Sequence, residues 1–327
     1  MRPEFVFSDD ERDALHEAFL SAFVSPYDDY QAFRRWIREL ALVGDVVTRY
    51  AEFCDELAGR DFAQSPLYLV ANCPIDRDLP VFDPADPVRS KYERKRTFAT
   101  ESFLALHAAL TCTELVAHAS VNGGDFFHDI YPKESMYESQ SQKTLGTLRF
   151  HRDFTNHFVR PDFVSTIVLR DTPENEVFST YVVNRDLIRS LPAAVVEVLR
   201  QERFHTPYDD ISTQGGSRLG RAPDHAVVTG DAGVRLFEGR TRGTDPEAEL
   251  ALDACVAALH RLKVRYTPGP GDLVAFSNDH LLHGREVVAV RDIESMRRRW
   301  LMKTHNVYAL EPLERFFLSD RYGVVDG

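Results

Sequence analysis

Hydrophobic residues recur at helical spacing through the first hundred residues. Ser8 followed by Glu11 is a capping-box pattern that opens a helix in SDDERDALHEAFLSAF. A longer helical stretch covers residues 29–60 and reaches Gly59, a residue type that often ends helices. The run SPLYLVANCPID is typical of a strand, and a further helix is expected over residues 101–118. The N-terminal part is therefore predicted to be mostly helical.

From about residue 119 the pattern changes to short β-type runs separated by turns. These runs are LRFHRDF, DFVSTIVLRD, EVFSTYVVN, HAVVTGDAGVRLFEG, GDLVAF, REVVAV and RWLMKTHNVY, and the GDAG between two apolar runs predicts a hairpin. Helical inserts are expected at 185–201 and 246–262. Such a succession of strands favours an α+β fold with a jelly-roll core, the double-stranded β-helix.

We expect one domain over residues 1–327, with a mostly helical flank at 1–118 and the jelly-roll core at 119–327. The segment ISTQGGSRLGRAPDH, residues 211–225, is rich in glycine and polar residues. That composition predicts a mobile loop that could act as a lid.

Composition narrows the classes of function. The chain has 327 residues, 43% of them hydrophobic, and a net charge of −12, which argues against broad nucleic-acid binding. It lacks both a signal peptide and an apolar run long enough to cross a membrane, so we expect a cytoplasmic protein. The four cysteines form no CxxC pair and are expected to be buried free thiols. The sequence carries no signal of oligomeric state.

Candidate chemistry begins with His151 and Asp153, two residues apart in a strand-like run. Residues i and i+2 of a strand share a face, which suits a metal ion but also an ordinary polar strand edge. A second histidine, His283, follows the strand-like GDLVAF, and Arg299 opens a later strand. Two imidazoles and one carboxylate form the facial arrangement that binds non-haem Fe(II) and leaves three positions open. A nearby guanidinium can grip a carboxylate through two parallel hydrogen bonds.

On FHRDFTNHFVRPDFVSTIVLRD, PGDLVAFSNDHLLHGR and RWLMKTH, the chain resembles the Fe(II)/2-oxoglutarate-dependent oxygenases. Within them it is similar to the clavaminate synthase-like amino-acid hydroxylases, which are related to taurine dioxygenase. The resemblance implies that His151, Asp153 and His283 bind Fe(II). In that branch the first motif is commonly His-x-Glu, whereas this chain has Asp153. Related halogenases replace the carboxylate with a small residue, so halogenation is disfavoured.

The resemblance also implies contacts to 2-oxoglutarate. Arg299 matches the arginine that binds the distal carboxylate, because it precedes the tryptophan of the strand. Arg297 stays a second choice, since the interval from His283 is longer than in the family, and it would share a strand face with Arg299. Ser179, or Thr180 after a one-residue slip, is expected to assist the same carboxylate.

The activity so implied is oxygenation of an unactivated C–H bond with O2, giving succinate and CO2 from 2-oxoglutarate. The expected substrate is a small molecule, a free amino acid or an amine-bearing intermediate of specialised metabolism. Hydroxylation is the default outcome, while desaturation, cyclisation and epimerisation use the same ligands. A protein-modifying hydroxylase and a non-catalytic jelly-roll binding protein are the alternative classes.

Other polar residues have simpler interpretations. His157 could orient the site, although packing is the favoured interpretation, and His280 is expected to lie at the surface or behind the site. Asp209 and Asp210 could pair with a cationic substrate near the proposed lid, but a solvated turn is the favoured interpretation.

Overall fold

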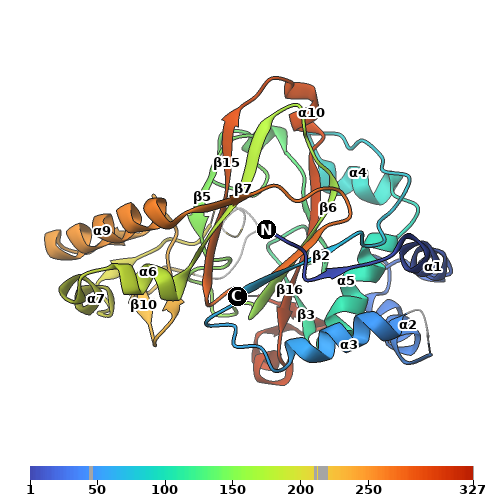
Figure 1. The fold of residues 1–327 in the computed structure, drawn as a ribbon, viewed down its shortest axis with the longest axis horizontal. Helices are drawn as coiled ribbons and strands as arrows, with labels where there is room; N and C mark the ends of the chain where they lie inside the picture. Colours follow the sequence, from blue (N-terminus) through green and yellow to red (C-terminus); the bar gives the residue numbers. More distant parts are fainter. Residues whose placement is uncertain (44–46, 210–211, 213–219, 327) are drawn as a thin grey trace.

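The computed structural model describes residues 1–43, 47–209, 212 and 220–326 and mixes helices with two main sheets (Figure 1). Five helices precede the second half of the chain: α1 (Asp9–Leu20), α2 (Tyr30–Val43), α3 (Thr48–Leu57), α4 (Pro87–Arg94) and α5 (Ala99–Leu110). Three longer inserts follow, α6 (Asn184–Ser190), α7 (Ala193–Leu199) and α9 (Pro246–Leu262), and the short α10 (Ile293–Arg297) precedes the last long strand.

The larger sheet has nine strands and the smaller has four. The larger runs in the order β1 (Phe5–Val6), β2 (Leu67–Ala71), β14 (Leu273–Ser277), β6 (Phe163–Arg170), β16 (Trp300–Val307), β3 (Glu114–His118), β18 (Arg321–Val325) and β17 (Phe317–Leu318), and β4 (His128–Ile130) also pairs with β16. The smaller runs β13 (Val264–Tyr266), β7 (Glu176–Val183), β15 (Leu281–Ala289) and β5 (Leu148–His151). Minor pairings join β8 (Phe204–His205) to β9 (Asp224–His225) and β12 (Arg242–Gly243), and β10 (Val228–Thr229) to β11 (Gly233–Val234).

Both faces of the larger sheet are buried. Successive side chains of a strand point to opposite faces, and in this sheet each face packs against other elements. In β6, Ile167 and Leu169 belong to one apolar cluster with residues of α1, α2, α3 and α5. Val164, on the opposite face of the same strand, packs with Phe276 of β14 and Tyr181 of β7. The N-terminal helices therefore cover one face, and the smaller sheet covers the other.

The helical inserts cover the outer face of the smaller sheet. Val182 of β7 and Leu282 of β15 belong to an apolar cluster with Leu187 of α6 and Leu252 and Leu259 of α9. In Figure 1 these helices project to one side, away from the N-terminal helices. The space between the two sheets is thus closed on both outer sides by helices.

Much of the expected local structure is present. Ser8 and Glu11 form the capping box of α1, the predicted strand runs coincide with β5, β6, β7, β14, β15 and β16, and the GDAG hairpin joins β10 to β11. The predicted insert at 246–262 is α9, and the insert at 185–201 is the pair α6 and α7. The mixed helix and sheet class is confirmed.

Three expectations about the N-terminal part were wrong in detail. The stretch 29–60 contains two helices, α2 and α3, and Gly59 lies beyond the end of α3 without a left-handed conformation. The helix expected over 101–118 ends at Leu110, because Cys112 has a positive φ of 52° and the β-type run Glu114–His118 then forms β3. The flank also supplies β1, β2 and β3 to the larger sheet.

Three of the four cysteines match the expectation. Cys54, Cys73 and Cys255 are buried free thiols, but Cys112 is exposed in the turn after α5. The segment proposed as a lid lies mostly outside the described residues. Among the helices of the described chain, none has the length and apolar character needed to cross a membrane.

Candidate metal centre

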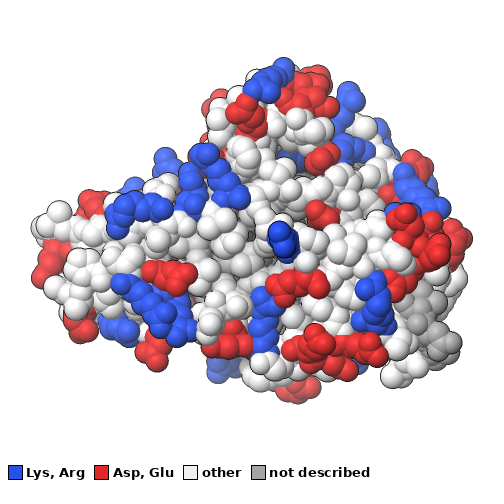
Figure 2. Space-filling model, viewed as in Figure 1, with Lys and Arg blue, Asp and Glu red and all other residues white. Residues whose placement is uncertain are grey.

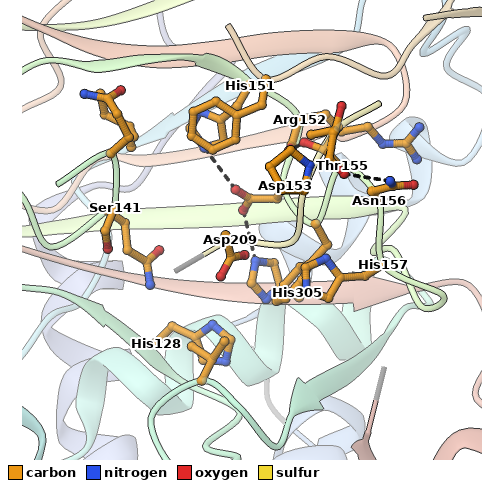
Figure 3. Close-up of a pocket in the computed structure, with 18 of the residues that line it drawn as sticks. His128, Ser141, His151, Arg152, Asp153, Thr155, Asn156, His157, Asp209 and His305 are labelled. Atoms are coloured by element: carbon orange, nitrogen blue, oxygen red, sulfur yellow. Dashed lines mark hydrogen bonds and ion pairs between the residues drawn. The ribbon is translucent and has the colours of Figure 1, made fainter. Parts of the chain in front are cut away.

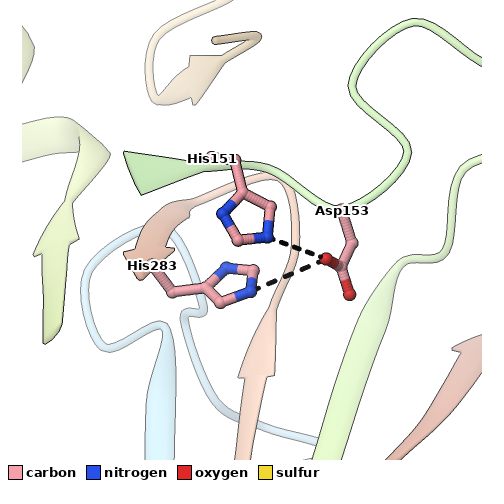
Figure 4. A group of neighbouring side chains, drawn as sticks. All are labelled: His151, Asp153 and His283. Carbon is pink, nitrogen blue, oxygen red and sulfur yellow. Dashed lines mark ion pairs between the residues drawn. The ribbon is translucent and has the colours of Figure 1, made fainter. Parts of the chain in front are cut away.

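Two strands of the smaller sheet and the segment after one of them bring His151, Asp153 and His283 together (Figure 4). His151 ends β5, and its direct cross-strand partner on β15 is His283. Asp153 follows two residues after His151, and its Oδ1 lies 3.3 Å from His151 Nε2 and 3.6 Å from His283 Nε2. Within the described residues this is the one group of three side chains placed to share a metal ion.

Hydrogen bonding fixes which nitrogen of His151 faces the centre. His151 Nδ1 lies 2.9 Å from the carbonyl oxygen of Arg149, an atom that can only accept, so Nδ1 carries the proton. Nε2 is the ring nitrogen that faces Asp153 and His283. A histidine that donates its other N–H to a backbone carbonyl is the usual arrangement in metal sites. Burial lowers the pKa of His283 well below its usual value, so this imidazole is uncharged at neutral pH.

The carboxylate of Asp153 is fully engaged on its second oxygen. Lys303 Nζ lies 2.6 Å and His305 Nε2 lies 3.0 Å from Oδ2, and all three side chains are buried. Burial alone raises the pKa of Asp153, but the charge of Lys303 and the contacts with His151 and His305 hold it well below its usual value. Asp153 is therefore an ionised carboxylate at neutral pH.

The main chain of Asp153 is held as firmly as its side chain. Asn278, in the turn between β14 and β15, accepts a hydrogen bond from Asp153 N–H at 3.0 Å and donates to Asp153 C=O at 3.1 Å. The same amide donates to the carbonyl of Pro161. Phe154, the next residue, has a φ of 53°, which is rare for a bulky residue.

A cavity between the two sheets adjoins His283, and we name it the arginine-lined cavity after Arg285 and Arg299. Its walls come from β6, β7, β13, β14, β15 and β16. Both guanidiniums are buried, and no carboxylate of the described residues forms an ion pair with either. Arg285 donates to the carbonyls of Thr144 and Gly146, whereas burial lowers the pKa of Arg299 to about 10. Two buried guanidiniums that form no ion pair within the described residues favour an anionic ligand.

Some of the residues predicted to contact this anionic ligand line the cavity, and one does not. Ser179 and Thr180 both line the arginine-lined cavity, and Ser179 pairs across the sheet with Arg285. Arg297 does not, since it lies on α10, where it pairs with Glu294 at the surface. The expectation that Arg297 shares a strand face with Arg299 was wrong, because β16 begins only at Trp300.

On the other side of Asp153 lies a second cavity, which we name the histidine-lined cavity after His128, His157 and His305 (Figure 3). These three imidazoles are buried, and in each the Nδ1 atom has no hydrogen-bond partner among the described residues. Burial lowers the pKa of His157 and of His305 to about 4, so these two imidazoles are uncharged at neutral pH. Asp209 also lines this cavity and accepts a hydrogen bond from Ser212 N–H.

These positions change two of the simpler interpretations. His157 lines the cavity and bonds to Ser212 Oγ at 2.8 Å, so it does more than pack. Asp209 is a cavity residue, not only part of a solvated turn, whereas Asp210 lies outside the described residues. His280 is half-buried beside Ser277 and outside the metal group, as expected.

Sequence reasoning missed Lys303, His305 and Arg285. The first two continue the alternation that begins at Arg299, since Leu301, Lys303 and His305 follow it at intervals of two on β16. Arg285 stands two residues after His283 on β15. Strand alternation from a recognised site residue was therefore the available signal.

The donor set fits a non-haem iron centre better than zinc. Two imidazoles and one carboxylate with several open positions match Fe(II) oxygenases, whereas zinc most often takes four tetrahedral ligands. The partly exposed face of His283 and both cavities adjoin the same centre. A metal held here could contact an anionic ligand on one side and a second ligand on the other.

Comparison with known proteins agrees with this chemistry. No protein-family model matches the chain. It is 26% identical over 187 residues to L-lysine 3-hydroxylase of Catenulispora acidiphila, a match that covers 54% of this chain and about half (51%) of that protein. It is 25% identical over 261 residues to L-asparagine oxygenase of Streptomyces coelicolor, covering 76% of this chain and 74% of that protein.

A solved structure extends the likeness to the whole fold. Asparagine oxygenase in complex with Fe(II), 2S,3S-3-hydroxyasparagine and succinate has a TM-score of 0.82, with 20% sequence identity and 99% of each chain covered. At this identity the structural likeness establishes a shared fold, and the two sequence relatives supply the link to hydroxylases.

Proposed function

We propose that this chain, a relative of the clavaminate synthase-like amino-acid oxygenases, is a non-haem Fe(II)/2-oxoglutarate-dependent oxygenase that hydroxylates a free amino acid or a related amine. The curated relatives bear out the enzyme class expected from the motifs. The observation that carries the proposal is the triad His151, Asp153 and His283, with two buried arginines beside it that form no ion pair within the described residues.

In this proposal His151 Nε2, Asp153 Oδ1 and His283 Nε2 hold Fe(II). The bound metal would activate O2 with 2-oxoglutarate as co-substrate, so that the substrate C–H becomes C–OH while 2-oxoglutarate yields succinate and CO2. The protein supplies position and exclusion of water. The burial of His151, Asp153 and the two guanidiniums, Arg285 and Arg299, serves both purposes.

The arginine-lined cavity is the proposed site of 2-oxoglutarate. Arg299 binds its distal carboxylate, and Ser179 of β7 adds a hydrogen bond from its hydroxyl group. Arg285 adds positive charge, although its guanidinium is already engaged by backbone carbonyls. Thr180 pairs with Gly284 and is the alternative hydroxyl.

The histidine-lined cavity is the proposed site of the substrate. His128 Nε2 bonds to the carbonyl of Asp125 and His305 Nε2 bonds to the Asp153 carboxylate, so both rings carry their proton on Nε2. Their Nδ1 atoms are buried, so they are not offered to a ligand in the cavity. Asp209 contributes a carboxylate to the lining, and a carboxylate suits a substrate with an amine side chain.

The fold supports the same assignment. We propose that the two facing sheets form the double-stranded β-helix of this enzyme class, with the metal at one end of the space between them. The two cavities are lined largely by buried residues, which suits a small molecule better than a protein chain.

The test is formation of succinate from 2-oxoglutarate when purified, iron-loaded protein is offered single amino acids. We expect an amine-bearing amino acid to stimulate succinate release and to gain one oxygen atom. His151→Ala should abolish both, while His280→Ala, a nearby histidine outside the triad, should leave them unchanged. Full activity in His151→Ala would remove that residue from the ligand set.

A further inference from the structure

The two oxygens of Asp153 have different surroundings. Oδ1 faces His151 and His283, whereas Oδ2 accepts hydrogen bonds from Lys303 at 2.6 Å and His305 at 3.0 Å. A carboxylate oxygen offers about two acceptor positions, so these two donors fill Oδ2. The contact with Lys303 is charge-assisted and short, and it is the stronger of the two.

The two donors come from one strand and are themselves held in place. Lys303 and His305 lie two residues apart on β16, so their side chains share the face that looks toward Asp153. Both are buried, at 6% and 1% exposed. On the neighbouring side, Asn278 anchors the backbone of Asp153 through both its N–H and its C=O.

We propose that Lys303 and His305 are positioning residues that keep Asp153 a one-oxygen metal ligand. This inference rests on the proposed oxygenase function. If Asp153 could offer both oxygens, it would occupy two positions of a six-coordinate metal, and with two imidazoles only two positions would stay open. With Oδ2 held by β16, three stay open, the number required for a co-substrate bound through two atoms and one molecule of O2.

Lys303 also lies between the proposed site of 2-oxoglutarate and the proposed site of the substrate. It lines the arginine-lined and the histidine-lined cavity. A lysine ammonium placed there repels the metal ion and cannot itself be a ligand while it is protonated. Its position is explained by the carboxylate that it holds.

The experiment counts the water molecules on Mn(II) bound to the otherwise metal-free protein, by magnetic resonance of the Mn(II) and its bound water. Wild type should hold three waters, and so should Lys303→Arg, which keeps a charged donor. Lys303→Met keeps the length of the side chain but removes the donor, so Oδ2 can turn to the metal and the count should fall to two. Affinity of the Mn(II)-loaded Lys303→Met protein for 2-oxoglutarate should fall about tenfold or more, while Mn(II) itself still binds.

Three waters in folded Lys303→Met, or loss of Mn(II) binding in it, would overturn the inference. Lys263→Met, a substitution of the same kind at a lysine that pairs with Glu286 away from the centre, should match wild type. If Lys303→Met does not fold, Lys303→Leu, which also lacks the donor but is less bulky, takes its place and should likewise hold two waters. Failure of wild type to bind Mn(II) at all would instead contradict the proposed function.

Discussion

At the scale of single residues, the site is organised around Asp153. Its side chain has four polar neighbours, and its backbone is bound by Asn278. A glutamate, common at this position in the family that the chain resembles, would reach further by one methylene. The shorter side chain of Asp153 instead accepts hydrogen bonds from Lys303 and His305 of β16.

Arg299 offers the clearest test of a single residue. Replacing it with alanine removes the buried guanidinium that we assign to the distal carboxylate of 2-oxoglutarate. We expect the KM for 2-oxoglutarate to rise about 10- to 100-fold, the value of a charged hydrogen-bonded pair, while the KM for the amino acid changes little. Steady-state kinetics with each substrate varied in turn measures the split.

Arg297→Ala is the matched control for Arg299→Ala. Arg297 lies on α10 and pairs with Glu294 outside the cavity, so its loss should leave both KM values as in wild type. If Arg297→Ala raised the KM for 2-oxoglutarate and Arg299→Ala did not, the assignment of the cavity would be wrong.

A site residue could be predicted from the sequence where it belongs to a short recognisable motif. His151 and Asp153 are two positions apart, and His283 and Arg299 stand in recognisable runs, so sequence alone singled them out. Lys303, His305 and Arg285 act through contacts between strands that lie far apart in the chain. Spacing cannot show such contacts before strand pairing is known.

At the scale of elements, β16 joins the parts of the site. Its central residues pair with β6, and its inward side chains run from the arginine-lined cavity to the histidine-lined cavity. The turn between β14 and β15 is the second joint, since Asn278 there binds both Asp153 and Pro161.

We expect Asn278→Ala to weaken the attachment of the β14–β15 turn to Asp153 and Pro161. It removes three hydrogen bonds of a fully buried side chain, each worth about 1 kcal/mol net. The free energy of unfolding should therefore fall by about 3 kcal/mol, measured by urea denaturation of the metal-free protein. His280→Ala, in the same turn but with one side-chain bond, to Ser277, should lose about 1 kcal/mol at most. Equal losses in the two variants would contradict this role of Asn278.

The elements themselves were predictable where one periodicity dominated. Short β-type runs between turns gave β6 and β7, and the helical period gave α1 and α9. The boundary after α5 was missed because ELVAH continues an apolar pattern that suits either a helix or a strand. Its pairing with β16 in the larger sheet decided the outcome.

At the scale of the whole molecule, two sheets enclose the site and helices cover both outer faces. Basic and acidic side chains are interspersed over the face drawn in Figure 2. The charges that matter for the proposed chemistry are instead inside, on Arg285, Arg299, Lys303 and Asp153.

Buried neutral histidines should make the fold sensitive to acid. His107 bonds to Tyr50 and Tyr68 behind the larger sheet, and burial lowers its pKa from 6.5 to about 4. The unfolded chain therefore takes up a proton before the folded protein does as the pH falls. The stability that neutral His107 contributes is complete above pH 6.5 and is lost between about pH 6.5 and 4, on the order of 3 kcal/mol.

His107→Gln isolates this contribution, because glutamine does not titrate. The free energy of unfolding of wild type should decrease more steeply than that of the variant between pH 6.5 and 4, and the two slopes should agree above pH 7. Parallel curves over the whole range would mean that His107 takes up its proton as easily in the folded protein as in the unfolded chain.

The central claim is that the triad and Arg299 bring Fe(II) and 2-oxoglutarate together. The most direct measurement is an anaerobic titration of metal-free protein with both, following the visible charge-transfer absorption that appears when a 2-oxo acid chelates Fe(II). We predict that the band appears with wild type and with His280→Ala and is absent with His283→Ala. A folded wild-type protein that gives no band, or a band that survives in His283→Ala, would contradict the account.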